Sequence, residues 1–280
     1  MNFWDNENEI DLKILEEKVV KPKNITPQSQ HIVLIHGFAI DSRCWELYTE
    51  QNENNYLHLI NLPGHGSQEY NIYELSFRAM VAIVKKYLKT LLSEHEINLV
   101  AHSYGAAIAL VAAHELISEN NGKNLKKIIL LAPYSRFSIS KVVDKINLFK
   151  VRDSESFMNL QKVIFVDAKK TVLSLTKYLY EKLSLEFFRK NFKYFKWVIL
   201  GMSLPSTFYK INDALKEIGP QSYFLFGEKD QLVNEEKTIK CASSKENIIP
   251  YTTIYKNCGH AFFIEEKERF FEEIENIIGS

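Results

Sequence analysis

The sequence predicts an α/β fold, in which helices cover both faces of a mostly parallel sheet. Short apolar runs alternate along the chain with longer segments whose apolar residues recur at helical spacing. Because parallel strands need long crossover connections that are usually helical, this alternation favours one doubly wound sheet. With 280 residues, of which 46% are hydrophobic, the chain is long enough to bury one large core.

Six apolar runs have the form of strands that are buried on both faces of a parallel sheet. They span residues 31–35, 56–60, 97–101, 126–131, 222–226 and 251–255. Helical spacing predicts helices at about residues 73–93, 106–118, 206–218 and 265–278. Near the start, Ile10, Leu12 and Ile14 alternate with polar residues, which predicts a half-buried strand there.

One segment, residues 135–205, interrupts this rhythm. It contains no convincing buried strand, and it is helical in pattern and rich in aromatic residues. We therefore expect a helical cap that is inserted into a core domain formed by residues 1–134 and 206–280. Segments above a rigid sheet commonly carry the residues that choose the substrate.

The composition excludes several kinds of partner. The formal net charge is zero, so no overall field attracts nucleic acid. The three cysteines form no C-x-x-C pair, which argues against a disulfide framework or a structural zinc site. No metal-ligand spacing and no dinucleotide-binding fingerprint is found, so we expect no metal and no cofactor. Because the first residues also lack an apolar export segment, we expect a cytoplasmic protein.

Ser103 lies between a predicted strand and a predicted helix, in the sequence VAHSYGA at residues 100–106. This is the context that a nucleophile elbow requires. Small residues two positions before and after the serine, here Ala101 and Gly105, let strand and helix approach each other. Ala101 replaces the usual first glycine of G-x-S-x-G. A serine after a strand is also a common helix N-cap, so the flanking motifs must distinguish a catalytic serine from a structural one.

Further motifs surround this serine in the order of the α/β-hydrolase family, which the sequence resembles over nearly its whole length. Residues 34–38 (LIHGF) are similar to the family's segment after the third strand, and residues 61–66 (NLPGHG) to its D-x-P-G-x-G turn. Residues 227–233 (GEKDQLV) resemble its acid loop, and residues 257–263 (NCGHAFF) its histidine motif. The resemblance implies an α/β-hydrolase sheet with the cap inserted after the sixth strand.

The resemblance also implies a role for each site residue. Ser103 would be the nucleophile, His260 the general base and Asp230 the acid that orients the histidine, in the chain order of this fold. The backbone amides of Phe38 and Tyr104 would hold the oxyanion.

Other carboxylates compete with Asp230 for the role of the acid. Glu228 lies in the same loop and would reach the imidazole if that loop differed by a residue or two. Asp144 or Asp153 would serve if the acid followed the sixth strand instead.

The other histidines are weaker candidates than His260. His36 and His65 belong to turn motifs and are expected to be structural, although His36 borders the site. His102 precedes the nucleophile, and its side chain should point away.

The cap carries a candidate substrate pocket. Phe188, Phe192 and Phe195 fall on one predicted helical face, which would cover an apolar acyl pocket together with His36. The same face would equally well pack the cap onto the sheet. Lysines interleave with these aromatic residues, so peripheral contact of the cap with a lipid surface is a further hypothesis.

The leading functional hypothesis is a serine hydrolase that cleaves carboxylic esters of small or medium acyl chains through an acyl-enzyme. A C–C bond hydrolase or an iminopeptidase of the same fold is the alternative. An iminopeptidase needs cap carboxylates, for which the candidates are Asp144, Asp153, Glu155, Glu181 and Glu186. A non-catalytic ligand-binding homologue is the third hypothesis.

Overall fold

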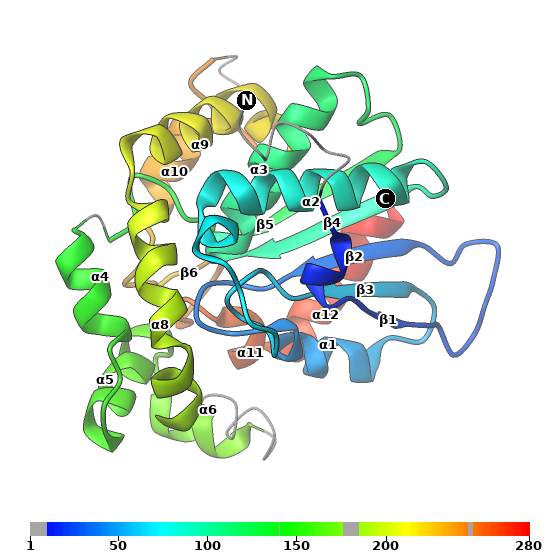
Figure 1. Cartoon of the computed structure of the whole chain (residues 1–280). Coiled ribbons are helices and arrows are strands. Elements are labelled where there is room, and N and C mark those ends of the chain that lie inside the picture. Colours follow the sequence, from blue (N-terminus) through cyan, green and yellow to red (C-terminus); the bar gives the residue numbers. More distant parts are fainter. Residues whose placement is uncertain (1–9, 140, 176–184, 246–248) are drawn as a thin grey trace.

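The computed structural model describes residues 10–139, 141–175, 185–245 and 249–280. Figure 1 shows one sheet across the molecule, with helices above and below it and a further group of helices at its left end. This arrangement confirms the α/β class that the sequence predicts.

Within the described residues, the sheet has seven strands in the order β1-β3-β2-β4-β5-β6-β7. In chain order the strands are β1 (Lys18–Val20), β2 (His31–Ile35), β3 (Tyr56–Ile60), β4 (Ile97–His102), β5 (Leu125–Leu131), β6 (Tyr223–Gly227) and β7 (Thr252–Tyr255). Neighbouring strands are parallel, except that the edge strand β1 pairs antiparallel with β3. The mostly parallel, doubly wound sheet is therefore confirmed.

Helices cover both faces of this sheet. One face carries α2 (Phe77–Leu92), α3 (Ser103–Ser118), α9 (Pro205–Ile218) and α10 (Glu235–Ala242), and the other carries α1 (Glu46–Gln51), α11 (Phe262–Glu265) and α12 (Lys267–Gly279) (Figure 1). Short 3-10 helices lie at Leu12–Leu15, Ser42–Trp45, Ile72–Leu75 and Gly219–Gln221. Over the described ranges, no helix combines the length and the apolar character needed to cross a membrane.

The segment between β5 and β6 is helical. It contains α4 (Val142–Phe149), α5 (Ser154–Ile164), α6 (Ala168–Ser174) and α8 (Leu185–Met202), which lie at the left of Figure 1. β5 is the strand that the family resemblance numbers sixth, so the insertion follows the predicted strand. The predicted boundary at residue 205 falls where α9 begins, and α9 packs against α3 of the core.

The centre of the sheet explains the rigidity of the region around Ser103. All six residues of β4 are buried, and α3, which follows it, buries aliphatic side chains around most of its circumference. Such continuous apolar sequence suits elements that are enclosed on both sides. The turn that joins them is therefore fixed at the carboxyl edge of the sheet.

The start of the described chain differs from the prediction. Leu12–Leu15 is a 3-10 helix rather than a strand, because Asp11 caps it by accepting a hydrogen bond from the amide of Lys13 at 3.0 Å. The sequence pattern also misses β1 and predicts no strand there. This edge strand is short and largely exposed, so it lacks an apolar run.

Candidate active site

Ser103 occupies a sharp turn between β4 and α3. Its φ of 52° lies in the left-handed region, which residues other than glycine rarely adopt. A Cβ atom at Gly105 would collide with the backbone carbonyl of His36, and one at Gly37 would lie 3.1 Å from the Cβ of Ser103. Glycine at these two positions therefore lets the serine turn lie directly against the loop that follows β2.

Three side chains from three loops form one hydrogen-bonded chain. The Nε2 atom of His260 lies 2.8 Å from the Oγ of Ser103, and its Nδ1 lies 2.7 Å from the Oδ2 of Asp230. The other carboxylate oxygen of Asp230 accepts hydrogen bonds from the amides of Leu232 at 2.7 Å and Val233 at 3.1 Å. The Asp230 side chain is 1% exposed and that of His260 6%. The structure thus aligns a buried carboxylate and a buried imidazole with the hydroxyl of a half-buried serine.

Close backbone contacts set the acid loop against the histidine loop. A Cβ atom at Gly227 would collide with the backbone of Gly259, and one at Gly259 would collide with the carbonyl of Ile164 in the cap. The amide of Gly259 also donates to Glu265 at 2.6 Å. These glycines therefore bring the loops of β6 and β7 and the end of α5 to one point.

The competing carboxylates lie elsewhere. Glu228 is exposed and accepts a hydrogen bond from the amide of Asn257 at 3.2 Å. Asp144 is exposed on α4, and Asp153 caps the start of α5. Of the acids that the sequence nominates, Asp230 is the one hydrogen-bonded to His260.

The two amides expected to hold an oxyanion belong to the residue that follows Ser103 and to a residue that lines the same cavities as Ser103. Tyr104 belongs to the first turn of α3, where backbone amides have no acceptor within the helix. Phe38 follows β2 and, like Ser103, lines both cavities described below. The helix dipole also favours negative charge at this end of α3. The oxyanion role of both amides stays a prediction.

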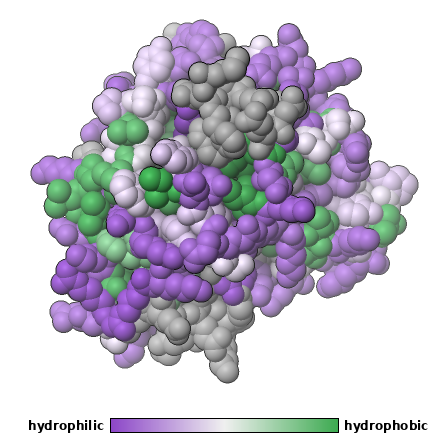
Figure 2. All heavy atoms as spheres, viewed as in Figure 1, coloured by the Kyte–Doolittle hydropathy of each residue, from purple (hydrophilic) through white to green (hydrophobic). Residues whose placement is uncertain are grey.

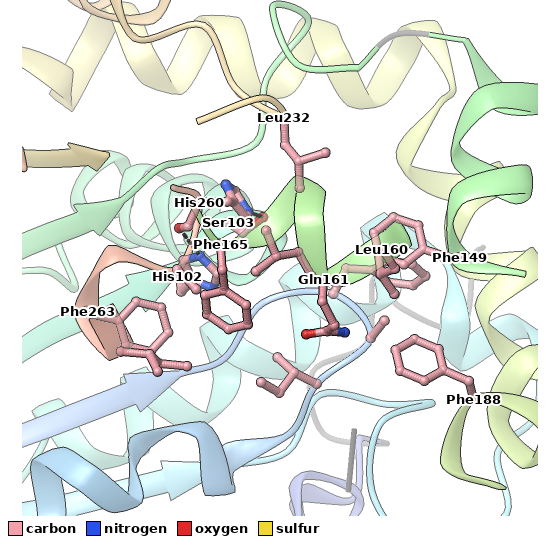
Figure 3. A pocket seen from close by; sticks show the side chains of 16 residues that line it. His102, Ser103, Phe149, Leu160, Gln161, Phe165, Phe188, Leu232, His260 and Phe263 are labelled. Carbon is pink, nitrogen blue, oxygen red and sulfur yellow. Dashed lines mark hydrogen bonds between the residues drawn. The ribbon is translucent and has the colours of Figure 1, made fainter. Parts of the chain in front are cut away.

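A largely apolar cavity lies beside Ser103 and His260, with about 630 Å³ of empty space. Figure 3 shows side chains of the cap and of the core facing each other across it. Its apolar walls include Phe38, Phe149, Leu160, Phe165, Phe188, Leu232 and Phe263. A second cavity, with about 380 Å³ of empty space including its solvent-open part, shares Ser103, Phe38, Phe149 and Leu232 with the first and extends toward the start of the cap.

The sequence predicts four pocket residues: His36, Phe188, Phe192 and Phe195. Phe188 lines the first cavity, but the other three line neither cavity. His36 is fully buried, and its Nε2 accepts a hydrogen bond from the amide of Leu62 at 3.0 Å, so it joins two turns. Phe195 packs edge-on against the Phe38 ring, 5.1 Å away, and Phe192 is half-buried. Most of this helical face therefore packs the cap onto the core.

His102 is closer to the site than predicted. Its side chain does not point away but lines the first cavity, with Nε2 3.2 Å from the backbone oxygen of His260. Burial holds the pKa of His102 well below 6.5, so the ring is neutral and its Nε2–H donates to that oxygen. The prediction failed because the His260 loop covers the very sheet face on which His102 lies. Phe263, on the same face, contacts the His102 ring at 4.8 Å.

Two polar residues of the cap were not predicted from the sequence to lie at the site. Gln161 on α5 is fully buried, and neither polar atom of its amide has a hydrogen-bond partner among the described residues. Lys145 on α4 is 3% exposed. Gln161 lines the first cavity and Lys145 the second. Each lies within a stripe of apolar residues at helical spacing: Gln161 in the stripe at positions 157, 160, 161 and 164, and Lys145 in the stripe at positions 142, 145, 146 and 149. A polar residue inside an apolar stripe is the sequence signal that would have identified both.

The part of the chain that the structure describes contains no cluster of three or more His, Cys, Asp or Glu residues placed to hold a metal ion. Cys44, Cys241 and Cys258 are buried free thiols. The chemistry open to the site is that of its hydrogen-bonded chain: the imidazole can accept the serine proton while the carboxylate stabilises the resulting cation.

Comparisons with known proteins give the family of this sequence and solved structures that resemble it. The sequence matches the alpha/beta hydrolase family over residues 32–273. No curated protein matches it. A proposed lipase from Acinetobacter baumannii is 17% identical, with a TM-score of 0.73, and the match covers 98% of this chain and 94% of that chain.

Two further solved structures represent different hydrolase activities. An esterase from Exiguobacterium antarcticum is 16% identical, with a TM-score of 0.65 and coverage of 94% and 95%. A 2-hydroxy-6-oxo-6-phenylhexa-2,4-dienoate hydrolase from a Rhodococcus species is 13% identical, with a TM-score of 0.67 and coverage of 91% and 92%. At such low sequence identities, these structural matches show a shared fold alone. Because the family match spans most of the sequence, the chain belongs to the alpha/beta hydrolase family.

Proposed function

We propose that this protein is a serine hydrolase that cleaves carboxylic esters of small or medium acyl chains through an acyl-enzyme. The observation that carries the proposal is the hydrogen-bonded chain of Asp230, His260 and Ser103 beside an apolar cavity. A half-buried serine with a strained backbone, bonded to an imidazole that a buried carboxylate orients, is the arrangement that nucleophilic catalysis needs.

In the proposed reaction, His260 takes the Ser103 proton as the oxygen attacks the ester carbonyl carbon. Asp230 stabilises the imidazolium, and the Phe38 and Tyr104 amides donate to the oxyanion. One such donor is worth about 2.7 to 4 kcal/mol in the transition state. His260 then protonates the leaving alcohol oxygen as the C–O bond breaks, and a water molecule repeats the sequence on the acyl-enzyme to release the acid.

The cavity walls support an ester substrate over an aminopeptidase substrate. An iminopeptidase has to bind a protonated amine, which calls for a carboxylate in the pocket. Neither cavity is lined by a described Asp or Glu residue. Among the candidate acids, Asp144 and Glu155 are exposed and Asp153 caps a helix. Glu181 lies outside the described residues, as does the side chain of Glu186.

Hydrolysis of a p-nitrophenyl ester series from acetate to palmitate tests the proposal. Ser103→Ala should lower kcat about 10⁴-fold or more, whereas Ser222→Ala, which removes a buried hydroxyl that donates to the backbone oxygen of Ile218, should leave it unchanged. The wild type should also react with a fluorophosphonate probe. Probe labelling without ester hydrolysis would favour a C–C bond hydrolase, and neither labelling nor hydrolysis would favour a non-catalytic binding protein.

We also propose that the cap makes peripheral contact with lipid surfaces. Trp197 and Leu200 lie one turn apart on α8 and are 41% and 43% exposed, and Leu204 follows at 51%. Lys193 and Lys196 flank them and are exposed. Figure 2 shows that hydrophobic residues on the viewed face gather in separate patches, one of them at the left edge, where cap helices lie in Figure 1.

Sedimentation with vesicles of phosphatidylglycerol tests the lipid contact. Binding should weaken in Trp197→Ala and with rising salt, because both the apolar insertion and the attraction to anionic headgroups decrease. Tyr251→Ala, which removes an aromatic residue that is 51% exposed on the core, is the matched control. If the wild type does not bind these vesicles at low salt, the proposed lipid contact is contradicted.

A further inference from the structure

At the start of the cap, a lysine ammonium is buried without a carboxylate partner among the described residues. Lys145 is 3% exposed, although lysine is almost never fully buried unless it is paired. Its Nζ atom donates to the hydroxyl of Tyr134 at 2.6 Å and to that of Ser203 at 3.0 Å. It also lies 4.9 Å from the Tyr134 ring centre and 5.7 Å from that of Phe208. No ion pair joins Lys145 to a carboxylate among the described residues.

This environment offers the ammonium no negative charge from a described carboxylate, and it leaves one of the three N–H donors without a partner among the described residues. The neighbouring acid on the same helix, Asp144, is exposed to solvent. An ammonium has three donors, and two hydroxyl oxygens satisfy two of them. Burial lowers the pKa of Lys145 to about 8, so at neutral pH most of the protein carries this charge. A buried cation with neutral partners is costly, and an anionic ligand would relieve that cost.

The ammonium faces the catalytic region. Lys145 lines the second cavity together with Ser103 and Phe38. Its partner Tyr134 is tied to the nucleophile turn, because the Tyr134 amide donates to the backbone oxygen of Ser103 at 3.0 Å. The remaining walls include Ile139, Phe149, Met202, Leu232 and Val233, which are apolar. Lys145 is thus the one charged side chain among the described residues that line this cavity.

The two cavities differ in their access to the general acid. His260 lines the first cavity but not the second. In ester cleavage the leaving alcohol oxygen has to lie within reach of His260, because this residue protonates it. The alcohol portion therefore belongs in the first cavity, and the acyl chain extends past Ser103 into the second.

We propose that Lys145 forms an anion subsite that binds a carboxylate at the far end of the acyl chain, so that the preferred substrates are half-esters of dicarboxylic acids. This inference rests on the proposed ester hydrolysis and specifies its substrate class. In the complex, the third N–H of Lys145 donates to the substrate carboxylate, while the apolar walls of the cavity cover the methylene groups between the two carbonyl carbons.

The test compares mono-p-nitrophenyl succinate, glutarate and adipate with unsubstituted p-nitrophenyl esters of matched chain length. The wild type should prefer at least one half-ester in kcat/KM by about 10-fold or more. Lys145→Met should lower kcat/KM for that half-ester about 10- to 100-fold more than it lowers kcat/KM for the matched neutral ester, which is the range expected for a lost hydrogen bond between charged groups. Lys150→Met, which removes an exposed cap lysine, should leave kcat/KM unchanged for both the half-ester and the neutral ester.

Equal losses on charged and neutral esters in Lys145→Met would overturn the inference, as would a wild type that prefers neutral esters throughout. Calorimetric binding of glutarate and adipate, with uncharged hexanamide as the comparison, adds a readout that does not need catalysis. If no ester is hydrolysed, the proposed function fails, and loss of dicarboxylate binding in Lys145→Met still supports the anion subsite. Absence of dicarboxylate binding to the wild type contradicts it. Lys145→Arg, which keeps the charge, should retain binding.

Discussion

Replacing Gln161 by methionine should stabilise the folded protein. The Gln161 side chain is fully buried, and neither its oxygen nor its nitrogen has a hydrogen-bond partner among the described residues. A buried polar group without a partner costs about 1–3 kcal/mol. Methionine is similar in length and adapts to irregular spaces, so the substitution removes the unpaired groups without opening a cavity. We expect the free energy of unfolding to rise by about 1–3 kcal/mol.

Thermal unfolding followed by circular dichroism measures the change. For a chain of this size, 1 kcal/mol corresponds to roughly 2 °C, so Tm should rise by about 2–6 °C. The urea midpoint should increase with an unchanged slope. Hydrolysis of neutral esters should persist, because Gln161 lies outside the hydrogen-bonded chain of the site.

Asn191→Leu is the matched control in the same cap. Asn191 is also buried, at 5% exposed, but its amide nitrogen donates to the backbone oxygen of Phe187 at 3.0 Å. Its replacement should lower Tm, since a satisfied hydrogen bond is lost. If Gln161→Met lowers Tm as much as Asn191→Leu does, the Gln161 amide is satisfied in solution and the reasoning is refuted.

Three further predictions follow from the site and the core. Asp230→Asn should lower kcat for ester hydrolysis about 10⁴-fold, because the amide favours the wrong imidazole tautomer, whereas Glu228→Gln should change kcat less than about twofold; similar losses would contradict the assignment of the acid. Gly105→Ala should lower Tm and abolish fluorophosphonate labelling, because the added methyl group collides with backbone; normal labelling would show that the turn has room. Burial lowers the pKa of His65 to about 3 and that of His31 to about 4, so both remain neutral in the fold while the unfolded chain binds protons below pH 6.5. Stability should therefore be fully present above about pH 6.5 and fall as the pH drops toward 4, as urea midpoints at several pH values would show, and a flat profile would argue against these pKa values.

The sheet is predictable from the sequence because its central strands are buried on both faces. β2 and β3 have the bounds that their apolar runs predict, and β4 differs from its run by one residue. The edge strand β1 is not predicted from the sequence because a mostly exposed strand needs no apolar pattern. The prediction of a strand near Leu12 is wrong because the Asp11 side chain bonds to the first turn of a 3-10 helix, which favours this helical turn over an extended chain.

The sequence by itself determined the parallel α/β sheet and the positions of Ser103, Asp230 and His260 at the ends of predicted strands. These features depend on local patterns: apolar runs specify strands, and glycines and small residues specify the turns between elements. The hydrogen bonds that join the three side chains, however, link residues up to 157 positions apart.

Only the tertiary structure decided what surrounds these side chains. It placed His102 beside His260, and it enclosed Lys145 and Gln161 between the cap and the core. Helical spacing shows that a side chain lies on a buried face but not which groups from other elements meet it there. Burial, pairing and access to a cavity arise from the docking of distant segments, so the substrate-binding walls of this protein became visible only in the fold.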